Sequence, residues 1–172
     1  MEQTVFTTRD FIPRSRDGHR GPPIAAHAET MTTPFAVLLA WCVPLTVIDA
    51  RTRRLPDLLT LPGAAGTLGY AAGGGRLAPA LAGALLLAGP YLLIHLGAPS
   101  ACGAGDVKLA VGLGAAAALG GARAWLAAAI AAPILTALAA TALLTRGAPR
   151  GQPVPHGPAM CGATLLALAL SG

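Results

Sequence analysis

Residues 77–97 read LAPALAGALLLAGPYLLIHLG and contain no Asp, Glu, Lys or Arg. A helix needs about 20 such residues to cross the hydrocarbon core of a bilayer. Apolar runs of similar or shorter length recur along the chain, and they make six candidate segments in all. We place these segments at Pro34–Ile48, Leu58–Ala72, Leu77–Gly97, Val107–Gly121, Ala124–Thr145 and Pro158–Ser171. The sequence therefore predicts an all-α, polytopic membrane bundle of about six transmembrane helices.

The composition of the whole chain agrees with this prediction. Apolar residues make up 54% of the 172 residues and charged residues only 11%, against about a quarter in an average soluble domain. Gly and Ala occur in every run and permit close helix packing, as at Gly112 and Ala116. The formal charge is +5, but the arginines lie in a tail and in short loops. We therefore expect membrane lipid, and no nucleic acid, among the partners.

The first 33 residues differ from the rest of the chain. They combine arginines and acids with a Gly-Pro-Pro run and show no apolar periodicity, so we expect a disordered tail over residues 1–33. Residues 34–172 then form one membrane domain. Met31, just before the first apolar run, is an alternative start of the protein.

Positive charges between the runs predict the orientation. Basic residues gather in the first and fifth connections, at Arg51, Arg53, Arg54, Arg146 and Arg150. The opposite side has only Arg76 and Arg123 near the helices. The positive-inside rule therefore places the first, third and fifth connections in the cytoplasm.

Only three acids occur from Pro34 onwards, namely Asp49, Asp57 and Asp106. Asp49 ends the first run and Asp106 opens the fourth, so a six-helix bundle places both at one membrane boundary, where ionisable groups are usually functional. Two carboxylates there can divide the work of proteolysis: one takes a proton from water while its protonated partner polarises the scissile carbonyl. Taken singly, each acid could instead pair with an arginine or cap a helix.

Three motifs surround these acids. Asp106 lies in Gly103-Ala104-Gly105-Asp106-Val107-Lys108-Leu109, Asp49 begins the segment DARTRRLPDLLT over residues 49–60, and residues 155–158 read Pro-His-Gly-Pro. In this order they resemble the GxGDxKL signature, the first-aspartate segment and the Pro-aromatic-Gly-Pro step of the type IV prepilin peptidase family. Asp57 replaces a more usual Asn, although both residue types can cap a helix. His156 replaces the aromatic residue, and we expect it to be solvated at a helix start.

The resemblance covers residues 34–172 and implies an aspartic endopeptidase with Asp49 and Asp106 as its catalytic pair. It places Gly103, Gly105 and Lys108 in the active-site motif, where the glycines would let an extended substrate approach the backbone. It also implies a prepilin or pseudopilin substrate of a type IV pilus or type II secretion system, cut at the cytoplasmic face of the plasma (inner) membrane. No metal or organic cofactor is implied.

Longer members of that family carry paired CxxC motifs in an extra segment and also methylate the new amino terminus. This chain has only Cys42, Cys102 and Cys161, scattered and unpaired in sequence. We therefore expect a short form that lacks the N-methylation domain. The three cysteines are expected to be small apolar fillers, with no disulfide framework and no zinc site.

Two further expectations concern individual side chains. Asp49 lies near the carboxyl end of a helix and Asp106 near an amino end, so the helix dipoles favour Asp49 as the protonated partner and Asp106 as the base. The remaining candidates are interpreted as scaffold: packing or interfacial anchors at Trp41, Tyr91, His95 and Trp125, and a snorkelling side chain at Lys108.

Two other functions remain open at this point. A small proton-coupled transporter would also use intramembrane acids, although it would place them near the bilayer centre and would not explain three ordered motifs. A noncatalytic membrane assembly factor descended from a peptidase would keep the motifs without the activity. The sequence gives no indication of the oligomeric state.

Overall fold

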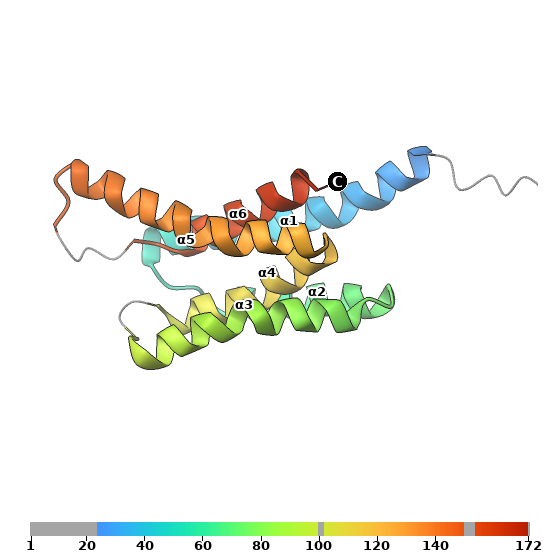
Figure 1. Ribbon diagram of the computed structural model, residues 1–172, viewed down its shortest axis with the longest axis horizontal. Coiled ribbons are helices and arrows are strands. Elements are labelled where there is room, and N and C mark those ends of the chain that lie inside the picture. Colours follow the sequence, from blue (N-terminus) through green and yellow to red (C-terminus); the bar gives the residue numbers. More distant parts are fainter. Residues whose placement is uncertain (1–23, 100–101, 150–153, 172) are drawn as a thin grey trace, which may run out of the picture.

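The computed structural model describes residues 24–99, 102–149 and 154–171, which form six α-helices and no strand (Figure 1). The helices are α1 (Ile24–Thr52), α2 (Asp57–Gly73), α3 (Leu77–Gly97), α4 (Ala104–Leu119), α5 (Ala122–Thr145) and α6 (Gly157–Ala169). The predicted all-α bundle of six helices is thereby confirmed. Helix α1 begins ten residues before the expected first run, so part of the expected tail is helical. Residues 1–23 and Arg150 lie outside the described residues.

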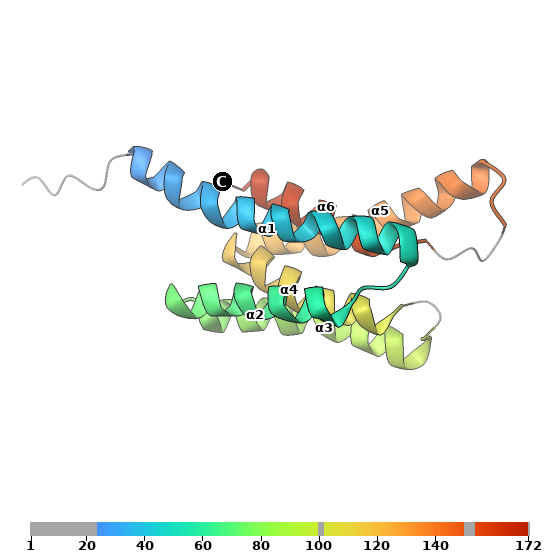
Figure 2. The same ribbon diagram turned by 180° about the vertical axis from the view of Figure 1, so that it is seen from behind.

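Successive helices run in alternating directions, as Figures 1 and 2 show from two sides. The connections α1–α2, α3–α4 and α5–α6 therefore lie at one end of the bundle, on the left of Figure 1. We call this the site end. The turns α2–α3 and α4–α5 lie at the opposite end, as does the start of α1.

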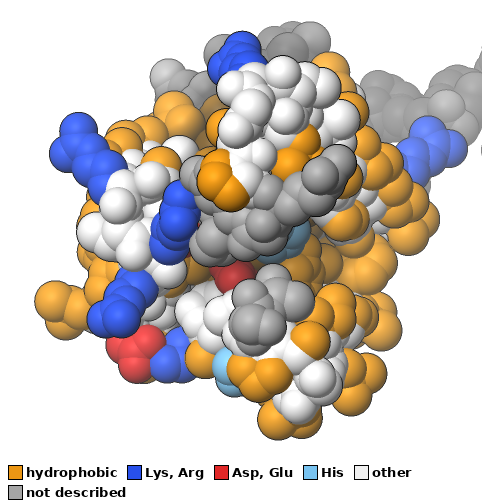
Figure 3. All heavy atoms as spheres, turned by 90° about the vertical axis from the view of Figure 1, so that its left-hand side faces the viewer, with side chains coloured by type: hydrophobic (Ala, Val, Ile, Leu, Met, Phe, Trp, Pro, Cys, Tyr) orange, Lys and Arg blue, Asp and Glu red, His pale blue; other side chains and the backbone are white. Residues whose placement is uncertain are grey.

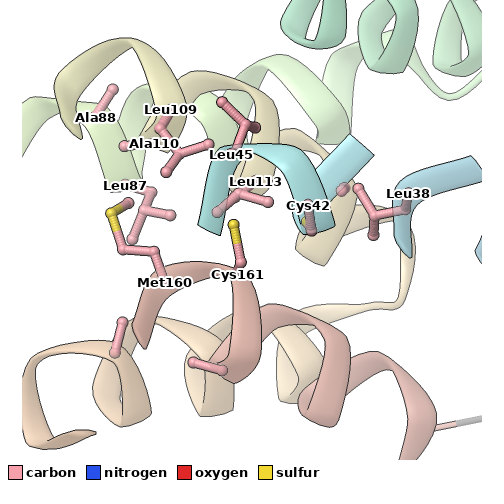
Figure 4. Close-up of a cluster of buried hydrophobic side chains, with 13 residues drawn as sticks. Leu38, Cys42, Leu45, Leu87, Ala88, Leu109, Ala110, Leu113, Met160 and Cys161 are labelled. Atoms are coloured by element: carbon pink, nitrogen blue, oxygen red, sulfur yellow. The ribbon is translucent and has the colours of Figure 1, made fainter. Parts of the chain in front are cut away.

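Helix α4 is the centre of the bundle. It packs against α2, α3, α5 and α6, and half of its 16 residues are buried. Leu109 and Leu113 of α4 meet Leu45 of α1 and Met160 of α6 in the main hydrophobic core (Figure 4). Because α4 has neighbouring helices on several sides, its small Gly and Ala residues let those helices pack closely against it.

Glycines set the closest approach between helices. A Cβ at Gly114 of α4 would lie 2.5 Å from the carbonyl oxygen of Gly83 on α3, and a Cβ at Gly83 would lie 2.6 Å from that of Gly114. Only glycine at both positions permits this contact. Trp125 of α5 packs against this helix contact, and its indole N–H donates to the Gly83 carbonyl at 3.0 Å.

Trp41 of α1 fills a slot made by two further glycines. Its ring occupies the space where a Cβ would be at Gly63 of α2 and at Gly112 of α4. Its indole N–H donates to the Leu59 carbonyl at 2.8 Å. Both tryptophans thus pack as expected and, in addition, hydrogen-bond to a neighbouring helix.

The surface is that of a membrane protein. Among the described residues, three segments are long and apolar enough to span a bilayer, Thr33–Thr52, Leu77–Gly97 and Ala122–Thr145, and α6 is a shorter apolar helix. At 1.5 Å per residue, α2 and α4 extend only about 25 Å. Large apolar side chains such as Leu58, Leu85 and Leu93 are exposed, and such a continuous apolar surface requires lipid rather than water around it.

Candidate active site

Asp49 lies in the last turn of α1 at the site end, and its side chain is buried, with the residue only 5% exposed. Its Oδ2 accepts the backbone N–H of Gly157, the first residue of α6, at 2.9 Å. A Cβ at Gly157 would lie 2.8 Å from the same oxygen. Residue 157 must therefore be glycine if the backbone at the start of α6 is to approach the Asp49 carboxylate this closely.

Asp106 is held by its own motif. It is the third residue of α4, is half-buried, and its Oδ2 accepts the backbone N–H of Gly103 at 3.0 Å. This is the reciprocal half of a capping arrangement, in which a carboxylate one turn into the helix satisfies the N–H at its start. The sulfur of Cys102 lies 3.9 Å from the same oxygen.

The structure brings the two carboxylates to the same end of the bundle from two different helices. The charge of Asp106 acts electrostatically on Asp49, although no hydrogen bond joins them in the part of the chain described. Each accepts an N–H at the start of a helix, where the helix dipole favours negative charge. The positive end of the α6 dipole thus offsets the negative end of the α1 dipole at Asp49. The helix dipoles therefore no longer distinguish Asp49 from Asp106, and which of the two carries the proton stays a prediction.

Gly105 makes room for the chain itself. Helix α1 ends at Thr52, and the next residue, Arg53, has a left-handed φ of 53°. Leu55 then passes beside the start of α4. A Cβ at Gly105 would lie 2.8 Å from the Leu55 Cβ. The open space expected for an extended substrate is therefore occupied here by Leu55. Gly103 is exposed, and a Cβ there would lie 3.5 Å from Asp106 Oδ2 and 3.9 Å from the Gly105 nitrogen, both ordinary contact distances.

Lys108 and Asp57 form an ion pair between α4 and α2. The Lys108 Nζ lies 2.6 Å from the Asp57 Oδ1, and both side chains are exposed, at 37% and 60%. Asp57 is the first residue of α2, with Pro56 in the N-cap position and no side-chain cap. The expected capping role of Asp57 and the simple snorkelling of Lys108 are therefore corrected.

His156 is not the solvated residue that we expected. It precedes α6 and is half-buried, and both of its ring nitrogens have partners: Nε2 lies 2.6 Å from the Tyr91 hydroxyl of α3, and Nδ1 lies 2.5 Å from the Thr136 hydroxyl of α5. Burial lowers the pKa of His156, while the negative charge of Asp49 opposes this shift. Tyr91, expected to be an anchor, is thereby part of a polar network.

The cysteines are free thiols, but they are more than fillers. Burial and the charge of Asp106 raise the pKa of Cys102 to about 11, so its thiol is neutral beside Asp106. Its carbonyl oxygen accepts a hydrogen bond from His95 Nδ1 at 2.8 Å. Cys42 and Cys161, distant in sequence, lie in the same buried cluster of the core (Figure 4).

Sequence reasoning missed Gly157, Cys102 and Thr136 as neighbours of the site. Gly157 stands inside a recognised motif, and Cys102 stands four residues before Asp106, so both had a signal. Thr136 had none.

No group of three or more metal-ligating side chains occurs within residues 24–99, 102–149 and 154–171. At the site end, Lys and Arg side chains lie mainly on one side, on the left of Figure 3, where acidic side chains are also visible.

The fold and this site define a helical membrane protein with two acids at one end of the bundle, each bonded to a backbone N–H at a helix start. The chain belongs to the Type IV leader peptidase family, whose model matches residues 36–145. It is therefore a membrane peptidase, and the matched segment contains both Asp49 and Asp106. No curated protein and no solved structure matches the chain.

Proposed function

We propose that this protein is an aspartic endopeptidase that removes the basic leader peptide from prepilins or pseudopilins, with Asp49 and Asp106 as its catalytic pair. One observation carries the proposal: two carboxylates from different helices lie at the same end of the bundle, and each is oriented by a backbone N–H at 2.9–3.0 Å. Oriented acids of this kind suit a reaction that needs one base and one proton donor.

The proposed chemistry uses a single proton shared by the pair. Because like charges close together disfavour a doubly ionised state, one carboxyl stays protonated while the other is ionised. The ionised group takes a proton from a water molecule, whose oxygen attacks the scissile carbonyl. The protonated group donates its proton to the carbonyl oxygen. The first group then gives the water proton to the leaving nitrogen as the C–N bond breaks, and the second recovers its proton as the new carboxyl group forms. Gly103 and Gly105 support this site by orienting Asp106 and by admitting Leu55.

The proposed setting is the cytoplasmic face of the plasma membrane. The site end carries Arg51, Arg53 and Arg54 just after α1, and the positive-inside rule places such a cluster in the cytoplasm. A substrate anchored by an apolar amino-terminal helix would present its leader at the same boundary. Pilus assembly and type II secretion are the systems that would supply such a substrate.

The test incubates membranes containing the protein with a tagged prepilin and looks for the shortened product. Asp49→Asn and Asp106→Asn should each lower cleavage by about 1,000-fold or more, because each removes one half of the acid–base pair. Asp57→Asn is the matched control and should retain activity. Full activity in either of the first two variants would refute the catalytic pair.

The same preparation separates the alternatives. A proton-coupled transporter would move protons in vesicles and leave the prepilin intact, and its flux would depend on Asp49 and Asp106. A noncatalytic assembly factor would bind the prepilin without shortening it. A shortened product that disappears in both aspartate variants is expected only from the peptidase.

A further inference from the structure

The first turn of α6 is tied to two other helices through His156. This residue occupies the N-cap position of α6, directly before Gly157, and its ring contacts Tyr91 of α3 at a centroid distance of 5.2 Å. The ring nitrogens are bonded to the Tyr91 and Thr136 hydroxyls. Three elements that are distant in sequence therefore meet at the residue that precedes the Asp49 hydrogen-bond donor.

The hydrogen positions in this network follow from its partners. The Thr136 hydroxyl has one proton and donates it to the Ala132 carbonyl at 3.0 Å, so its oxygen accepts from the Nδ1–H of His156. In a neutral ring, Nε2 is then an acceptor, and it takes the Tyr91 O–H. All three side chains are satisfied by one neutral tautomer.

Tyr91 also reaches the surroundings of the second acid. Its backbone carbonyl lies 3.7 Å from the sulfur of Cys102, and that sulfur lies 3.9 Å from Asp106 Oδ2. The Tyr91 side chain thus serves the α6 start, while its backbone lies beside the segment that holds Asp106. A shift of Tyr91 would be felt at both carboxylates.

We propose that His156 is a positioning residue: held between Tyr91 and Thr136, it fixes the first turn of α6 so that the Gly157 N–H points at Asp49 Oδ2. This inference rests on the proposed function, because it names how one acid of that site is oriented. The physical basis is preorganisation. A hydrogen-bond donor that is fixed in place keeps the carboxylate in one geometry, and a misplacement near 1 Å can cost about 100-fold in rate.

The experiment compares three variants with two controls. Tyr91→Phe and Thr136→Val each remove one hydrogen bond to His156, and His156→Ala removes both. Tyr70→Phe, on an exposed tyrosine of α2, and Thr141→Val, whose hydroxyl bonds only within α5, change the same chemical groups elsewhere. Because the tyrosine and threonine variants are nearly isosteric, they keep the bundle intact even if His156→Ala does not fold.

We expect kcat for prepilin cleavage to fall about 10-fold in Tyr91→Phe and Thr136→Val and about 100-fold in His156→Ala, with KM changed less than about threefold. Adding Tyr91→Phe to His156→Ala should cost nothing further, because the two changes break the same bond. The control variants should match the parent protein. Unchanged kcat in all three network variants, or additive effects in the double variant, would overturn the inference.

A second measurement does not depend on cleavage. The infrared carboxyl band of Asp49, identified by its disappearance in Asp49→Asn, should shift in the three network variants and not in the two controls. A parent protein that cuts no prepilin but shows these shifts would refute the proposed function and leave the positioning role standing. A band that is unmoved by Tyr91→Phe and Thr136→Val would refute the positioning role, whatever the activity.

Discussion

Asp49 and Asp106 have similar chemistry and different means of support. Asp106 is bonded to Gly103, three residues away, inside one continuous motif. Asp49 is bonded to Gly157, 108 residues away, on a helix that is itself held by two others. One environment is built by local sequence and the other by the packing of the bundle.

The local support of Asp106 should be more robust than the tertiary support of Asp49. A local cap forms as soon as its helix forms, because donor and acceptor belong to the same turn. The Asp49 contact forms only when α1, α3, α5 and α6 are all in place. Substitutions far from Asp49 in sequence should therefore disturb it, whereas Asp106 should respond mainly to changes in its own motif.

Among the variants that compare the two kinds of support, Gly157→Ala should have the largest effect, with Gly103→Ala as its counterpart. The new Cβ would lie 2.8 Å from Asp49 Oδ2 in the first case and 3.5 Å from Asp106 Oδ2 in the second, and only the first is a clash. We expect prepilin cleavage to fall about 100-fold in Gly157→Ala and to stay within about threefold in Gly103→Ala. Equal losses in the two variants would show that the two acids are supported alike.

Next in size is the effect of Gly105→Ala on stability. Its Cβ would lie 2.8 Å from the Leu55 Cβ, close to the backbone of the α1–α2 connection, and such overpacking typically costs about 1–3 kcal/mol. Thermal unfolding in detergent should show the loss.

The matched control is Gly66→Ala in α2, where a new Cβ would meet nothing within 4 Å. Removing a flexible glycine from a helix should stabilise it by about 0.5–1 kcal/mol. A Gly105→Ala protein as stable as the Gly66→Ala protein would mean that Leu55 moves aside freely.

A pH effect should separate the support of Asp49 from that of Asp106. Burial lowers the pKa of His156, and the negative charge of Asp49 opposes this shift. The Tyr91 hydroxyl is bonded to the same ring. The folded state therefore disfavours protonation of His156. The contribution of the neutral ring to the free energy of unfolding is fully present above the unfolded pKa of about 6.5. It is lost as pH falls through the lower pKa of the folded state. Thermal unfolding midpoints should fall over this range in the parent protein.

The control for the pH effect is His156→Phe, which should flatten that part of the pH profile. Gly103→Ala should leave it unchanged, because Asp106 has no link of its own to the His156 ring. A parent profile that His156→Phe leaves unaltered would assign the acid transition to other groups.

The smallest expected effect is that of Asp57→Asn or Lys108→Gln. Both partners are exposed, and exposed ion pairs contribute about 0–1 kcal/mol. We expect unfolding midpoints within a few degrees of the parent, and a smaller difference still at high salt. A large loss in either variant would show that the α2–α4 pair supports the site more than its exposure suggests.

The sequence by itself determined the helices and the end at which the acids lie. Apolar runs separated by short polar connections must alternate in direction across a membrane, so the end of α1 and the start of α4 share one boundary. The motif around Asp106 also contained its own partner, because a capping bond lies within one turn. The family followed from the same residues.

Only the tertiary structure decided what surrounds Asp49. The contacts of Gly157, His156, Tyr91 and Thr136, and the meeting of Cys42 with Cys161, depend on how each helix is rotated about its axis and how closely glycines let it approach its neighbour. Apolar composition does not specify that rotation when nearly every face is Ala, Leu or Gly. The packing of a few glycines and tryptophans does, and it joins residues that no local pattern connects.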